Sequence, residues 1–285
     1  MLMNTQYNAK TILEFSEKNG RVVTDRTYTE GNARISSPMP NPDHEAYYFL
    51  ITMGGGFIEG ENYLIDVTVH DRASAILTSQ APTYIFRSLG GEYTKQNIEL
   101  TLGQNATLEF LMDDLLPYKD AKFKQNTNIH LTSSSNLIYL DGTTSGWSPD
   151  EKLFTYDILK LDTKIYLDNK LVVNDHFLYE PIEYNDFNHL GLFESYTNYN
   201  TLIAINPKID DEYIKNMRET LAKLDVQASF GVSKLECPGF ILRILGKTID
   251  DNKDVIYTCA NKVRQDLFGF GPYELRKNDY KKMIS

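Results

Sequence analysis

The sequence is poor in cysteine and in long hydrophobic runs. Its 285 residues include 2 cysteines, Cys237 and Cys259, which stand at no metal-ligand spacing. Two thiols in a chain of this length are typical of a cytosolic protein. The opening residues, MLMNTQYNAKTILEF, lack the apolar segment of a signal peptide, and no run approaches the length of a membrane span. We therefore predict a cytoplasmic protein without a membrane segment.

Positive charge is scarce relative to negative charge. Lys and Arg total 29 against 39 Asp and Glu, which gives a net charge of −10. A field of that sign repels phosphate backbones, so we expect no nucleic-acid partner. It attracts cations or a basic protein face, although the same charge also serves solubility alone.

Motifs of catalysis and of nucleotide or metal binding are missing as well. The 5 histidines have neither HxH nor HExxH spacing, which argues against a preformed zinc site. The segment GGGFIEGE, from Gly54 to Glu61, lacks the Lys-Ser/Thr pair of a phosphate-binding loop. We expect its glycines to allow positive φ or a close backbone approach instead. No Ser or Cys nucleophile signature is present, and we predict no catalytic residue.

The sequence does contain repeated β-strand patterns. Three segments are related at an offset of about thirty residues, in the range of repeat architectures: VTVHDRASAILT from Val67, LTLGQNATLEFL from Leu100 and IHLTSSSNLIYL from Ile129. In each, a short strand, a polar turn and a second strand follow one another, and Ala75, Leu108 and Leu137 fall in register. A shorter fourth unit turns at Asp168-Asn169.

These patterns predict a mostly β fold of layered hairpins over residues 60–180, similar to a β-solenoid, because one hairpin cannot bury its apolar face alone. An ordinary β-sandwich is the alternative. Apolar periodicity predicts two α-helices in the C-terminal third, over residues 210–224 and 250–268, with GFILRILG between them as a buried strand. We treat residues 1–285 as one domain, and favour a frayed end over a docking segment from Tyr273 onward.

Carboxylates are the remaining candidates for chemistry. Asp66 and Glu109 alternate with apolar strand residues, Asp114 follows the second strand of a unit, and Asp141 ends another. Stacked units can bring such acids together at their ends. Clustered carboxylates serve either as an acid–base pair, as in glycosidases, or as transient ligands of divalent cations. The spacing alone leaves both alternatives open.

Five segments in order carry a resemblance to a known family. KNGRVVTDRTYTEGNARI, GGGFIEGENYLIDVTV, ASAILTSQAPTYIFRS, ATLEFLMDDLLPY and GVSKLECPGFILRILG resemble segments of the UreD/UreH family of urease accessory proteins. The residues that match the family motifs are Gly54, Gly55, Gly60, Glu61, Thr78, Arg87, Ser88, Arg243 and Gly246. Departures also occur: Tyr84 replaces a lysine, Phe110 a tryptophan and Met112 a proline. Asp113-Asp114 stands for a Gln-Glu pair, and a Gly-Trp-Glu segment survives only as Asp141.

The resemblance implies a protein that catalyses no reaction and binds the urease apoprotein subunits together with UreF and the GTPase UreG. It also implies a layered β fold with two helices, and nickel that passes in transit through a water-filled polar passage, with no stably bound cofactor. By position, Asp66, Glu109, Asp114 and Asp141 would line that passage. We expect the C-terminal helices and tail to contact partners. The alternative function is a β-solenoid glycan-active enzyme with a carboxylate pair.

Overall fold

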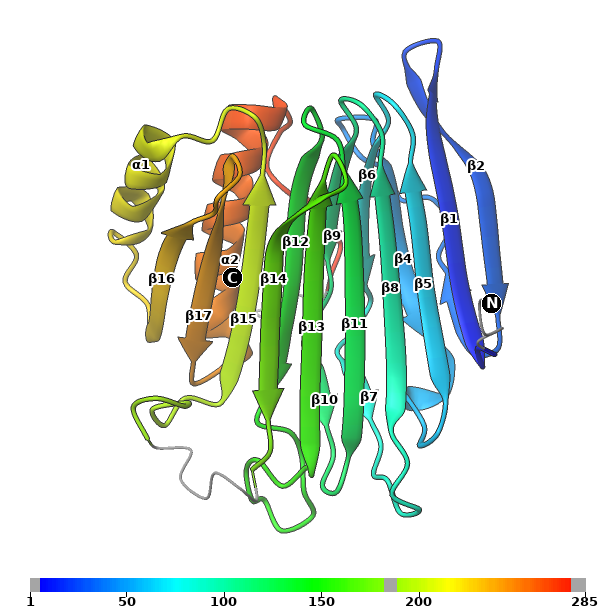
Figure 1. Ribbon diagram of the computed structural model, residues 1–285, viewed down its shortest axis with the longest axis vertical. Coiled ribbons are helices and arrows are strands. Elements are labelled where there is room, and N and C mark those ends of the chain that lie inside the picture. The colour runs from blue at the N-terminus through cyan, green and yellow to red at the C-terminus, as the bar shows by residue number, and fades with distance from the viewer. Residues whose placement is uncertain (1–5, 182–188, 278–285) are drawn as a thin grey trace.

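Two β-sheets lie face to face, with two helices against one of them (Figure 1). The computed structural model describes residues 6–181 and 189–277. Sheet A has seven strands in the order β14-β13-β11-β8-β5-β1-β2 and lies in front in Figure 1. Its strands are β1 (Ala9–Lys18), β2 (Arg21–Glu30), β5 (Asn62–Val69), β8 (Thr94–Leu102), β11 (Lys122–Leu131), β13 (Ile158–Leu167) and β14 (Lys170–Tyr179).

Sheet B has ten strands and lies behind sheet A in the same view. Its main path has the order β16-β17-β15-β12-β9-β6-β4-β3, and β7 and β10 pair beside it. The strands are β3 (Ala33–Ile35), β4 (Ala46–Thr52), β6 (Ser74–Ser79), β7 (Thr83–Ile85), β9 (Thr107–Leu111), β10 (Leu115–Pro117), β12 (Asn136–Thr144), β15 (Asn198–Ile205), β16 (Ala228–Lys234) and β17 (Gly239–Gly246). A short 3-10 turn, η1 (Met53–Gly55), follows β4.

The predicted stack of repeated units is confirmed. In sheet B, Ala75 of β6 pairs with Leu108 of β9, and Leu108 pairs with Leu137 of β12, all in parallel. In sheet A, β5, β8 and β11 pair in parallel in the same way. Each unit therefore contributes one strand to each sheet, and its strands bond to the neighbouring units. The polar turn between them is an arch that crosses from sheet A to sheet B.

Alternating apolar side chains from both sheets form the core. Val67 and Leu100 of sheet A and Leu77 and Leu108 of sheet B are fully buried in one cluster. Because side chains alternate along a strand, the residues between them point to the outer faces. The predicted turn at Asp168-Asn169 joins β13 to β14 in an antiparallel hairpin, and both residues have the positive φ of a type I′ turn, 47° and 65°.

The glycine-rich segment has the backbone role expected from its sequence. Gly54 lies at φ 80°, which an L side chain rarely adopts. At Gly56 a Cβ atom would collide with the Tyr84 carbonyl oxygen. The backbone N–H of Phe57 donates to that same oxygen at 2.8 Å, so the segment must approach β7 closely.

Both predicted helices pack on the outer face of sheet B. They are α1 (Asp211–Leu221) and α2 (Ile249–Val263), and α2 continues as a π-helical turn, η2 (Arg264–Phe268), up to Gly269. Asp210 caps α1, and Thr248 and Asp251 form a capping box on α2. Ile214 of α1 and Val255 of α2 share a buried cluster with Phe240 of β17. No helix within the described residues is long and apolar enough to span a membrane.

The expectation of a frayed end from Tyr273 is wrong for residues 273–277. The Tyr273 hydroxyl donates to Glu109, and the Lys277 ammonium lies 2.8 Å from a carboxylate oxygen of Asp113. Leu275 packs against a small apolar cluster on the outer face of β4 and β6. Sequence periodicity missed these contacts because they join residues more than a hundred positions apart. Residues 278–285, the rest of the predicted tail, lie outside the described residues.

We expect Leu108→Ala to lower the free energy of unfolding by about 2–5 kcal/mol, because the cavity it leaves lies in a closed core. Leu89, which is 72% exposed, is the matched control, and Leu89→Ala should change stability by less than about 0.5 kcal/mol. Urea unfolding followed by circular dichroism measures both. Equal losses in the two variants would contradict the assignment of Leu108 to the core.

Candidate functional site

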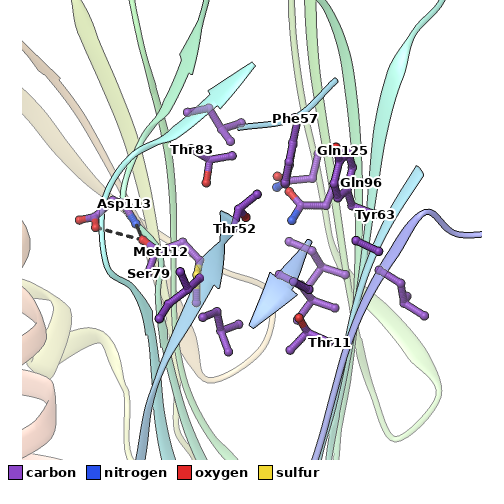
Figure 2. A pocket seen from close by; sticks show the side chains of 18 of the residues that line it. Thr11, Thr52, Phe57, Tyr63, Ser79, Thr83, Gln96, Met112, Asp113 and Gln125 are labelled. Atoms are coloured by element: carbon purple, nitrogen blue, oxygen red, sulfur yellow. Dashed lines mark hydrogen bonds between the residues drawn. The ribbon is translucent and has the colours of Figure 1, made fainter. Parts of the chain in front are cut away.

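Three cavities follow one another across sheet B and the space between the sheets. The intersheet cavity has a volume of about 60 Å³ and lies between the facing strands (Figure 2). The C-terminal cavity, of about 280 Å³, lies between the outer face of sheet B, α2 and Lys277. The edge cavity, of about 10 Å³, lies where β13 and β14 face β12 and β15.

Asp113 separates the C-terminal cavity from the intersheet cavity and borders both. The Ser79 hydroxyl donates to one of its carboxylate oxygens at 3.0 Å, and the Lys277 ammonium lies 2.8 Å from the other. Figure 2 shows Asp113 pointing away from Gln96 and Gln125, which line the opposite wall. The carboxylate therefore has one oxygen on each side of the wall.

Asp141 lies between the sheets and borders both the intersheet and the edge cavity. One of its oxygens accepts hydrogen bonds from the Gln125 amide at 2.6 Å and the Tyr139 hydroxyl at 2.9 Å. The other accepts from the Gly142 backbone N–H at 2.9 Å. Burial raises the pKa of Asp141 to about 6 despite these three donors.

Asp114 is 6% exposed and lines the C-terminal cavity. One of its oxygens accepts a hydrogen bond from the Asn200 amide at 2.5 Å, and the other has no partner among the described residues. Gly142 makes this approach possible, since a Cβ there would lie 2.6 Å from the bonded Asp114 oxygen. Burial raises the pKa of Asp114 to about 7, and the charges of Asp113 and Asp141 add to the increase.

Each of the three cavities is thus bordered by at least one of the three aspartates, and Asp113 and Asp141 each border two of them. At the far end, the edge cavity reaches Asp175 of β14, whose carboxylate forms an ion pair with Arg243 of β17. Arg243 also donates to the Tyr199 hydroxyl at 3.1 Å. Cations of the protein therefore lie at both ends, Lys277 at one and Arg243 at the other.

The four acids named from the sequence do not lie in one place. Asp114 and Asp141 border the cavities, and the charge of Asp141 adds to the burial that raises the pKa of Asp114. Asp66 lies half-buried on the outer face of sheet A, because its neighbour Val67 points into the core. There its strand position pairs with that of Glu99 on β8.

Glu109 points to the outer face of sheet B, under the helices and the C-terminal segment, and lines none of the three cavities. Its carboxylate is fully buried and forms an ion pair with Arg264, which also lies 2.5 Å from Glu45 and 2.7 Å from Asp43. Burial and the Glu45 charge raise the pKa of Glu109 well above its usual value. Arg264 therefore links the segment after α2 to β9 through Glu109. It links the same segment to the loop before β4 through Asp43 and Glu45.

The residues of the family motifs lie mainly where the backbone is constrained. The Thr78 hydroxyl donates to the Leu111 carbonyl, and the Ser88 hydroxyl accepts from the Lys122 backbone N–H at 3.2 Å. Glu61 accepts from the Tyr63 hydroxyl. Gly246 faces Asn252, where a Cβ atom would overlap the side-chain oxygen. Arg87 is exposed, and Arg243 contacts Tyr199 and Asp175, which line the edge cavity.

Three contributors were not singled out from the sequence as part of this site: Asn200, Gly142 and Lys277. Asn200 is held in place by Asn252 of α2, whose amide donates to it at 2.7 Å. Their positions depend on contacts between β9, β12, β15 and the C-terminal segment. The only sequence signal was the acidic pair Asp113-Asp114 directly after a strand.

The donor set has weak metal-binding chemistry. No three His, Cys, Asp or Glu side chains within residues 6–181 and 189–277 are arranged to hold a metal ion together. The cavities instead offer single carboxylates beside amides and hydroxyls, all of them hard oxygen or nitrogen groups. A divalent cation at such a position keeps most of its water ligands.

Comparison with known proteins assigns the chain to a family. The family model described as UreD urease accessory protein matches residues 7–278. The chain is 41% identical over 280 residues to the urease accessory protein UreD of Streptococcus salivarius, covering 98% of this chain and 100% of that protein. It is 32% identical over 255 residues to the protein of that name from Bacillus cereus, covering 89% and 92%.

A further relative, the urease accessory protein UreD of Ureaplasma parvum serovar 3, is 34% identical over 229 residues, with 80% of this chain and 79% of that protein covered. The matches define the class of this protein as a urease accessory protein. The chain belongs to the UreD family. The resemblance found in the sequence motifs is thereby confirmed.

We expect Asp114→Asn to stabilise the protein more at pH 8 than at pH 5. The pKa of Asp114 is raised from 3.8 to about 7 in the folded state, so the folded protein loses stability relative to the unfolded chain as the pH rises through that window. The amide keeps the shape and the Asn200 hydrogen bond but carries no charge. The gain over wild type should grow by about 2–3 kcal/mol between the two pH values.

Chemical unfolding at both pH values measures this difference. Asp211→Asn, at a carboxylate that is 79% exposed, is the control and should show the same offset from wild type at each pH. A gain for Asp114→Asn that does not depend on pH would contradict a buried, easily protonated Asp114.

Proposed function

We propose that this protein is a non-catalytic maturation scaffold that acts in the cytoplasm. It binds the urease apoprotein together with UreF and the GTPase UreG, and it supports delivery of nickel to the urease active site. Membership of the UreD family supports the accessory role. The observation that supports the route is the line of Asp113, Asp114 and Asp141 through three cavities.

Transit requires weak and repeated binding rather than one tight site. Thiolate and imidazole ligands favour nickel strongly and would hold it, whereas carboxylates and carbonyl oxygens bind it less tightly. The buried carboxylates lie in a low-dielectric interior, where their attraction for a divalent cation is stronger than in water. Because Asp113 and Asp141 each border two cavities, every cavity on the proposed route offers a carboxylate to the cation.

Among the acids named from the sequence, we assign this role to Asp114 and Asp141 and add Asp113. Glu109 already forms a buried ion pair with Arg264 and lines none of the three cavities. Asp66 lies on the outer face of sheet A, away from the cavities. Binding of partners by the C-terminal helices and tail stays part of the proposal, because α1 has one exposed face and the outward residues of α2 are exposed or half-buried.

The two cavities that Asp141 borders argue against the glycan-active alternative at that carboxylate. Pockets for organic ligands usually have volumes of about 300–1,000 Å³. The intersheet cavity has about 60 Å³ and the edge cavity about 10 Å³. The enclosed Asp141 carboxylate is therefore in a space too small for a sugar ring.

Asp114→Asn should lower urease activation in cells at limiting nickel by roughly 10-fold or more, since loss of one charged contact costs about 1.5–3 kcal/mol. Urease activity per molecule of urease measures the effect. Glu99→Gln, a half-buried acid on the outer face of sheet A, is the control and should activate as wild type does. The same Asp114→Asn protein should be at least as stable as wild type, so unfolding cannot explain the loss.

Normal activation by Asp114→Asn at limiting nickel would refute the acidic route. A tagged pull-down from the source cells tests the scaffold itself. We expect urease subunits and UreF to be recovered with the chain. Recovery of the folded chain alone would show that it does not assemble with urease, and the proposal would fail irrespective of the route.

A further inference from the structure

The C-terminal cavity contains a cation supplied by the protein itself. The Lys277 ammonium enters this cavity and lies 2.8 Å from a carboxylate oxygen of Asp113. Both side chains are largely buried, at 14% and 17% exposed. The ion pair is therefore shielded from solvent much more than an ordinary surface pair.

The same cavity presents an acceptor that Lys277 does not satisfy. Asp114 is 6% exposed, and one of its oxygens has no hydrogen-bond partner in the described part of the chain. The carboxylate is held in position through its other oxygen by Asn200, which is itself held by Asn252. A buried polar atom without a partner is costly, so its free side indicates a ligand position.

Charge and space in the cavity fit a divalent cation. Asp113 and Asp114 carry two carboxylates, whereas Lys277 contributes one positive charge. Lys253 also lines the cavity, but its ammonium lies 3.4 Å from Asp250. A volume of about 280 Å³ corresponds to roughly nine water molecules at about 30 Å³ each, which accommodates a hydrated divalent ion.

Lys277 is attached in a way that permits its departure. The C-terminal segment is anchored upstream by the hydrogen bond from Tyr273 to Glu109 and by the packing of Leu275. These contacts belong to a different part of the outer face of sheet B. Withdrawal of Lys277 needs only the ion pair with Asp113 to break, while the anchors stay in place.

We propose that the C-terminal cavity is a divalent-cation site at Asp113 and Asp114, and that Lys277 occupies its place beside Asp113 until a cation displaces it. The C-terminal segment and the cation then compete for one position. This inference rests on the proposed function, because it makes the cavity the regulated end of the nickel route. By linkage, a partner that draws the C-terminal segment away strengthens cation binding.

Calorimetric titration of the purified full-length chain with Ni²⁺ alone tests the competition. Lys277→Met removes the charge while keeping the length of the side chain, and we expect it to bind Ni²⁺ at least 10-fold more tightly than wild type. Lys277→Arg keeps the charge and should bind as wild type does. Lys234→Met, which breaks a surface pair with Asp211, is the matched control and should not change the affinity.

Hydrogen exchange on the wild-type chain gives a second readout that needs no variant. Saturation with Ni²⁺ should increase amide exchange at residues 276 and 277 and leave α2 and the anchored residues 273–275 unchanged. Unchanged exchange at residues 276 and 277, or equal Ni²⁺ affinity in Lys277→Met and wild type, would overturn the inference.

The failure of the inference can be told apart from failure of the proposed function. If Ni²⁺ binds wild type, is lost in Asp114→Asn and is indifferent to Lys277→Met, the acidic route stands and Lys277 does not compete. If Ni²⁺ binds neither wild type nor Lys277→Met, and Asp114→Asn activates urease normally, both the cation site and the route are wrong.

Discussion

The parallel register between successive units is the constraint on which the remaining structure depends. Each strand completes its backbone hydrogen bonds with the units on either side, so equivalent positions of all units come to lie side by side. Ala75, Leu108 and Leu137 form one apolar row of the core by this means. The same register places Gln96 beside Gln125 on sheet A, opposite the Asp141 carboxylate that Gln125 contacts. A polar layer thus crosses an otherwise apolar interior.

The charge state of each buried acid depends on which side chains the fold places beside it. Glu109 forms an ion pair with Arg264 in the turn after α2, and Asp113 forms one with Lys277 in the C-terminal segment. Asp114 and Asp141 are contacted by neutral donors, Asn200 and Gln125 among them, and burial raises the pKa of both. Burial of a charge without a counter-charge is costly, so these two carboxylates are the ones whose charge a passing cation would stabilise. The Glu109–Arg264 ion pair and the C-terminal cavity both lie on the outer face of sheet B, whereas Asp141 lies between the sheets.

Much of the fold was predictable because its signals are local. Strand alternation, the Asp168-Asn169 turn and the helix caps each depend on residues within a few positions of one another. The three-unit repeat was visible because parallel stacking demands similar residues at equivalent positions. The sequence patterns did not predict that the C-terminal segment docks on sheet B. They also did not predict that Glu109 points to the outer face of this sheet while Asp141 lies between the sheets. Each of these features depends on the face of sheet B to which a side chain points. Each also depends on long-range contacts such as that between Arg264 and Glu109, which are 155 positions apart.

The sequence by itself determined the family, the repeated β-strand units, the two C-terminal helices and the excess of acidic side chains. These follow from motif order, from periodicity and from composition, which need no knowledge of spatial neighbours. Only the tertiary structure decided which acids border a cavity and which already have a cation. The physical reason is that burial and pairing are properties of the assembled sheets: Asp113 and Asp114 are adjacent in the chain, yet one contacts Ser79 and Lys277 and the other Asn200.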